Sequence, residues 1–218
     1  MFIQGYRLSP ALEGALGQQS IMKFVDLKGV DQSSSEACGV SCDGGVARFM
    51  IIECEGIDLA ASSFDPVSGC ITGLATTGVG IGAEYVPDKD NTATLNFIGE
   101  LVGSTQNVNI EGFAKFKCIT KDKVTEANKL KKLCCIYIVA EMNDCNIVIA
   151  GIDVLTNCSV AGELRPSKEE LKAIVSLLWG TGEEESRMEL TFEGVQRCFT
   201  LVDKAVLTYD DIKASIGL

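Results

Sequence analysis

The chain has 218 residues, 46% of them hydrophobic, and a formal net charge of −11 at pH 7. That length and apolar share are enough for a sizeable core in one large or two small domains. Histidine is absent, which excludes Ser-His and Cys-His nucleophilic catalysis and any metal site that uses imidazole. The acidic balance disfavours conventional nucleic-acid binding, because such binding needs cations gathered on one face.

The ten cysteines are expected to be reduced thiols that pack as small hydrophobic side chains. A zinc site made of cysteines alone would need two paired knuckles. Cys38 and Cys42 have a suitable spacing and Cys134 is adjacent to Cys135, but no second knuckle completes four ligands. We therefore expect no metal and no cofactor. We also expect no membrane association, since no run resembles a spanning helix and no secretory signal is evident.

The first part of the chain divides into an arm and a strand-rich region. Residues 1–35 carry few core signals and are interpreted as an extended N-terminal arm, followed by a single β-rich domain over residues 36–218. A turn is expected from Phe64 to Gly69, where Asp, Pro, Ser and Gly each favour bending. Apolar and partly alternating runs predict strands at residues 46–53, 56–60, 70–75, 82–86, 93–100 and 107–119.

A lysine-rich helix is predicted from Thr120 to Leu133. Thr120 can cap it, the lysines near its end suit the helix dipole, and Val124, Ala127 and Leu130 fall on one face. An apolar hairpin is predicted directly afterwards, with strands at residues 134–140 and 147–152 and a turn over residues 143–146.

The last third of the chain is expected to contain a helical insert at about residues 157–179. Ser167 to Glu170 reads as a capping box, and Leu171, Ile174, Val175 and Leu178 as the apolar stripe of its helix. Strands are predicted at residues 188–192 and 198–207. Thr208 is expected to cap a terminal helix that reaches Ile216.

Three short motifs could indicate a binding or catalytic site, but in each case a purely structural interpretation is favoured. Gly78 to Ala83 matches a dinucleotide-binding pattern, but the residues after it continue as a strand instead of starting a helix. Asp88 to Thr92 hints at a calcium loop that lacks its glycine and its final glutamate, so a hairpin turn is favoured. Glu183, Glu184 and Glu185 read as a solvated turn. A nucleophile at Cys38 or Cys42 would lack a base, and no enzyme activity is expected.

Charge is unevenly distributed along the chain. Residues 113–133 hold seven lysines and two acidic side chains, whereas acidic residues outnumber basic ones elsewhere. A surface that carries basic and acidic regions of this kind is suited to binding other copies of the same chain. A solvated acidic protein with one basic helix is the alternative interpretation.

The order of these elements resembles tail-tube-type structural proteins of tailed bacteriophages, of the crAss-like type that infects Bacteroides-like bacteria. The similar stretches are residues 42–47, residues 64–73, the paired strands up to Lys117, the helix from Thr120, the hairpin around Asn143, the segment Gly180–Gly182 and the strand from Met188 to Gly194. The resemblance covers roughly residues 36–200. The insert at residues 157–179 departs from the simple pattern and leaves tail tube, neck ring and adaptor open.

The resemblance implies an α+β, β-rich fold: a β-sandwich or partial barrel flanked by one or two helices, with an extended N-terminal arm. It implies a virion structural protein, assembled in the bacterial host cytoplasm, that forms a hexameric or higher ring or tube. The partners implied are copies of itself, other tail or neck proteins, and DNA that passes through an acidic lumen without sticking. The candidate interface residues are Phe2, Ile3, Tyr6, Leu8, Glu183, Glu184 and Glu185. The rival hypothesis is an intracellular α+β scaffold module, similar to roadblock or profilin domains, with no catalysis.

Overall fold

The computed structural model describes residues 45–78, 82–87, 93–102, 105–157, 160–180 and 185–218. The chain divides into two units, Met1–Ser34 and Ser35–Leu218, and every described residue belongs to the second. The expected arm at residues 1–35 lies outside the described residues, so it and its boundary stay predictions. None of the described helices is long and apolar enough to cross a membrane.

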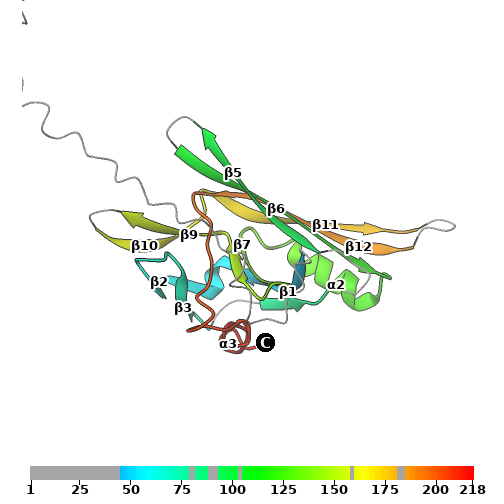
Figure 1. The fold of residues 1–218 in the computed structure, drawn as a ribbon. Helices are drawn as coiled ribbons and strands as arrows, with labels where there is room; N and C mark the ends of the chain where they lie inside the picture. Colours follow the sequence, from blue (N-terminus) through cyan, green and yellow to red (C-terminus); the bar gives the residue numbers. More distant parts are fainter. Residues whose placement is uncertain (1–44, 79–81, 88–92, 103–104, 158–159, 181–184) are drawn as a thin grey trace, which may run out of the picture. The chain divides into compact units, whose positions relative to one another are not determined.

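A four-stranded antiparallel sheet forms the centre of the second unit (Figure 1). Its order is β4-β1-β7-β8, with bounds Gly82–Tyr85, Val46–Glu53, Ile136–Met142 and Ile147–Ala150. The strands predicted at residues 46–53 and 82–86 and the hairpin after the lysine-rich helix are thereby confirmed. At the start of the hairpin turn Asn143 donates its backbone N–H to the Gly45 carbonyl, 3.0 Å away.

The central sheet is buried on both faces. Along β1, Phe49 and Ile51 belong to one apolar cluster, whereas the residues between and after them, Met50 and Ile52, belong to a second cluster on the opposite face. In β7 all five residues from Ile136 to Ala140 are buried. This double burial explains why these strands are continuous apolar runs instead of alternating ones.

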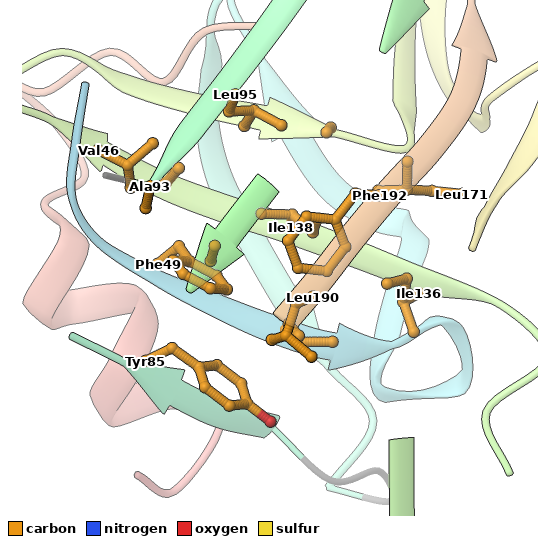
Figure 2. Close-up of a cluster of buried hydrophobic side chains, with 14 of the residues drawn as sticks. Val46, Phe49, Tyr85, Ala93, Leu95, Ile136, Ile138, Leu171, Leu190 and Phe192 are labelled. Carbon is orange, nitrogen blue, oxygen red and sulfur yellow. The ribbon is translucent and has the colours of Figure 1, made fainter. Parts of the chain in front are cut away.

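A longer antiparallel sheet covers one face of the central sheet (Figure 1). Its order is β11-β12-β6-β5, and the strands span Glu169–Leu178, Arg187–Gln196, Thr105–Lys117 and Thr94–Val102. Figure 2 shows Leu190 and Phe192 of β12 lying against Phe49 and Ile138 of the central sheet, all within one buried cluster. Two packed antiparallel sheets confirm the predicted sandwich.

Two hairpins and a terminal helix supply the apolar residues on the other face of the central sheet. The hairpins are β2–β3, with strands Ile57–Phe64 and Ile71–Thr76, and β9–β10, with strands Ile152–Asn157 and Val160–Pro166. Helix α3, Tyr209–Ser215, begins after Thr208, which forms a reciprocal capping box with Asp211. The predicted terminal helix is thus confirmed. Arg48 of β1 holds α3 to the sheet, because its guanidinium lies 4.2 Å from the Tyr209 ring centroid and 2.7 Å from the Asp210 carboxylate.

Helix α2, Lys121–Leu130, confirms the predicted lysine-rich helix, three residues shorter at its C-terminal end. The Thr120 hydroxyl accepts a hydrogen bond from the Lys123 N–H, as expected of a cap. Ala127 and Leu130 are buried in the same cluster as the facing sheets. The helix therefore buries one face and exposes most of its lysines.

The predicted helical insert at residues 157–179 is wrong. Residues up to Pro166 form the β9–β10 hairpin, and residues 169–178 form the edge strand β11. The Ser167 hydroxyl donates to the Glu169 carbonyl 2.7 Å away and caps no helix. Leu171 and Val175 are buried while Ile174 is 51% exposed, which fits a strand that presents alternate residues to the core.

The strand predicted at residues 198–207 is also wrong. Within it only Leu201 and Val202 form isolated bridges, to Val148 and Ile71 respectively. The segment lies against the edge of β8 through the bonds Ile149 N–H to Thr200 O (3.0 Å) and Val202 N–H to Ile147 O (3.0 Å). It closes that edge of the central sheet without forming a named strand.

The expectation that all cysteines are reduced is wrong for three of the described cysteines. Cys54 and Cys135 form a disulfide with a Cα–Cα distance of 5.5 Å, and Cys145 is disulfide-bonded as well. The ladder between β1 and β7 ends at the pair Glu53 and Ile136. The register of the sheet therefore brings the next residue of one strand and the preceding residue of the other within disulfide range. Cys70, Cys118, Cys134 and Cys198 are free thiols.

Candidate assembly surface

The long sheet has one face in the core and one open face. In β6 the core residues Val108, Ile110 and Ala114 are nearly inaccessible, and they alternate with the open-face residues Asn109, Glu111, Phe113 and Lys115. Cross-strand partners share a face. The open face therefore consists of the rows Ile98–Asn109–Val195–Glu169, Asn96–Glu111–Glu193–Lys172 and Thr94–Phe113–Thr191–Ile174, followed by Lys115–Glu189–Ser176 and Lys117–Arg187–Leu178.

The open face is concave. The concavity has a volume of about 1100 Å³, and its lining includes the charged side chains Glu111, Glu169, Glu170, Glu193, Lys168 and Lys172. Carboxylates thus outnumber ammonium groups there by four to two. Glu111 lies directly opposite Glu193 on the neighbouring strand, a pairing of like charges that costs some stability in the isolated sheet.

Charge on the open face changes along the strands. The acidic rows contain Glu111 and Glu193, whereas the rows at the other end contain Lys115, Lys117 and Arg187. Arg187 is paired with Glu189 at 2.6 Å, and Lys117 lies 3.8 Å from Glu185. The basic end is also the end from which the chain continues into α2. The surface therefore carries both signs of charge in separate zones, which favours oriented contacts over non-specific ones.

Both edges of the long sheet lack a strand partner among the described residues. β5 pairs only with β6, and β11 pairs only with β12. The edges are nine and ten residues long, and each presents a row of backbone donors and acceptors. Each also exposes an isoleucine on the open face: Ile98 of β5 is 43% exposed and Ile174 of β11 is 51% exposed. Long, apolar free edges are sites where another strand adds.

The two free edges run in opposite directions. Every neighbouring pair in the order β11-β12-β6-β5 is antiparallel. Four strands with alternating directions leave the first and the last antiparallel to each other. The β5 edge of one copy and the β11 edge of another can therefore continue the same antiparallel alternation.

The sequence-predicted interface residues are only partly within the described structure. Glu185 lies in the β11–β12 connection, is exposed, and lies beside Lys117. Glu183 and Glu184 lie outside the described residues, as do Phe2, Ile3, Tyr6 and Leu8. The structure therefore does not bring this set together, and the role of its members stays a prediction.

Sequence reasoning missed the β11 edge because it assigned residues 167–178 to a helix. The signal that could have found it is the alternation Leu171, Ala173, Val175, Leu177, in which two residues are buried and two partly buried. Polar or exposed residues occupy the positions between them up to Leu178. The helical stripe shares Leu171 and Val175 with this pattern, so the two patterns compete over the same short segment.

The concavity of the open face is lined by charged, polar and apolar side chains. Among the described residues no group of three or more Cys, Asp or Glu side chains could hold a metal ion. The structure does not describe residues 79–81 of the dinucleotide-binding pattern or residues 88–92 of the possible calcium loop, while Gly82 begins strand β4.

No family model, no curated protein and no solved structure matches this chain.

Proposed function

We propose that this chain is a self-assembling virion structural protein, the subunit of a tail tube or neck ring of a tailed bacteriophage. The observation that carries the proposal is the long sheet, whose open face is concave and whose two edge strands run in opposite directions and pair with no further strand among the described residues. The chain has no catalytic role in this proposal. The resemblance of the element order to tail-tube-type proteins supplies the biological setting, in which subunits assemble in the host cytoplasm and join other tail or neck proteins.

The two edges favour a ring over a two-fold dimer. A contact between β5 of one copy and β11 of the next joins two different surfaces, so it is heterologous and repeats in one direction. If the repeat closes, each subunit adds four strands to one continuous antiparallel barrel, and no free edge remains. A ring of identical subunits is the simplest structure that satisfies both edges at once.

The open face becomes the wall of the channel in such a ring. Its central rows carry more carboxylates than ammonium groups. DNA phosphates bind proteins chiefly because lysine and arginine neutralise them and thereby release their counterions into solution. The acidic zone of this wall carries few cations, and at its basic end Lys117 lies beside Glu185 and Arg187 pairs with Glu189. Such a wall would let DNA pass without holding it, which is the role proposed for this face.

The proposal is tested by the mass and shape of the purified protein. Light scattering coupled to size-exclusion chromatography is expected to give a ring or polymer mass, and negative-stain images are expected to show rings with a central channel. A stable monomer or dimer at high concentration would contradict the proposal and favour the scaffold-module alternative.

A paired variant tests whether the edges mediate assembly. Replacing both Ile98 and Ile174 with lysine places like charges on the two edges and is expected to abolish rings while preserving the circular dichroism spectrum. The matched control is Val67→Lys, because Val67 is 93% exposed in the β2–β3 turn. If the double variant assembles as well as the control, the contacts lie elsewhere.

A further inference from the structure

We infer that neighbouring subunits pair β5 with β11 in one register, the register that sets Ile98 of one copy opposite Ile174 of the next. This inference rests on the proposed ring and specifies its contact residue by residue. The occupant of each free edge is a second copy of this chain. Both isoleucines lie on the open face of an edge strand, and both are far more exposed than the isoleucines of the core.

The neighbouring positions of this register are chemically complementary. Antiparallel pairing of Ile98 with Ile174 also places Glu100 opposite Lys172 and Asn96 opposite Ser176. Neither Glu100 nor Lys172 takes part in an ion pair within the described structure, and both are exposed. An apolar pair, an opposite-charge pair and a polar pair would thus follow one another along the open face, each of a type that stabilises cross-strand contacts.

The other face of the same two strands fits as well. On the core side the register sets Phe97 against Val175 and Gly99 against Ala173. Phe97 packs at the edge of the core cluster, and Gly99 is exposed near Phe199. An aromatic side chain opposite a β-branched one is a favourable pair. Both faces of the joint would therefore be matched.

The in-line register is a poorer match. Continuing the existing row of Thr94, Phe113, Thr191 and Ile174 straight into the next copy would set Thr94 against Ile174. The row that contains Ile98 ends at Glu169, so Ile98 would then face a glutamate and each isoleucine would lose its apolar partner.

The geometry of a closed barrel also disfavours the in-line register. Strands in closed barrels tilt by roughly 35–45° from the barrel axis. This tilt requires that a row of paired residues, followed once around the barrel, returns to its first strand several residues away from where it began. In the in-line register each row returns to the residue where it began, so there is no stagger. The register proposed here displaces each row by four residues across four strands, which is one residue for each strand. An eight-stranded barrel with a shear of eight has the same ratio and a tilt of about 36°.

Disulfide trapping in the assembled protein tests the register. The double variant Ile98→Cys with Ile174→Cys is expected, on mild oxidation, to give a ladder of covalent oligomers on a non-reducing gel, up to the ring. Each single variant is expected to stay at the background set by the native thiols. The matched double variant Thr94→Cys with Ile174→Cys reports the in-line register. Its thiols should not meet, because four residues along a strand separate them by about 13 Å.

Charge reversal provides a second readout that does not depend on thiol chemistry. Glu100→Lys alone is expected to weaken assembly by at least tenfold in the concentration needed, and adding Lys172→Glu is expected to restore it. Efficient trapping of the Thr94–Ile174 pair, or trapping of neither pair in intact rings, would overturn the register but leave the ring. A wild-type protein that never assembles would overturn both proposals.

Discussion

The side chain of Asp153 shows how a single buried charge orders a crossing segment. Asp153 is fully buried in β9, and its carboxylate accepts hydrogen bonds from the Arg197 backbone N–H at 2.6 Å and from the Arg197 guanidinium at 3.1 Å. Nearby, Thr200 donates to the Ile152 carbonyl at 2.7 Å. These bonds fix the segment that leaves the long sheet and runs along β8. The sequence alone could not identify the role of Asp153, because its partners lie more than forty residues away.

Replacing Asp153 with alanine is expected to lower the free energy of unfolding by about 3–5 kcal/mol, because it leaves buried donors without an acceptor. Guanidinium denaturation measures the loss. Arg197→Ala should cost less, since the Arg197 side chain is 41% exposed and the carboxylate keeps its backbone donor. Equal stability of Asp153→Ala and the parent would show that the segment is held by other contacts.

At the scale of elements, the sequence predicts those whose signals are local. The cap at Thr120 and the spacing of Ala127 and Leu130 suffice to predict α2, and the cap at Thr208 predicts α3. Strand β11 was missed because the local pattern after Ser167 imitates a helix start. Pairing with β12 decides the outcome there, and pairing between strands depends on residues distant in sequence.

The Cys54–Cys135 disulfide also could not be predicted from local sequence signals. Cys54 and Cys135 are 81 residues apart, and only the register of β1 against β7 shows that they meet. The free edge of β5 and the open face of the long sheet could likewise not be recognised without knowing the strand order.

Removing the Cys54–Cys135 disulfide is expected to lower the free energy of unfolding by about 2–4 kcal/mol, because the unfolded chain regains the freedom of an 81-residue loop. Cys135→Ala, compared with the parent by denaturation without reductant, measures the effect. Cys134→Ser is the matched control, as Cys134 is the adjacent free and exposed thiol. A parent whose stability does not change on adding reductant would show that this bond contributes nothing.

At the scale of the whole molecule, the arm predicted at residues 1–35 should matter for assembly and not for folding. Deleting residues 1–20 is expected to leave the melting temperature of the subunit nearly unchanged, because this part of the sequence carries few core signals of its own. The same truncation is expected to reduce ring formation, because Phe2, Ile3, Tyr6 and Leu8 would no longer bury themselves on a neighbour. Sedimentation velocity measures how much of the protein is in rings and how much remains as single subunits, and thermal unfolding measures the melting temperature. Rings that form equally well without the arm would contradict this role.

The two unlike edges of the long sheet also determine how an assembly grows. A string of subunits joined β5 to β11 always ends in one free β5 and one free β11, whether it contains two copies or ten. Adding a subunit therefore leaves the string with two unpaired edges, and only closure into a ring removes them. The final contact costs no further loss of subunit freedom, because the two ends already belong to one assembly. Under the proposed function, a mixture at equilibrium should hold monomers and closed rings with few open strings between them.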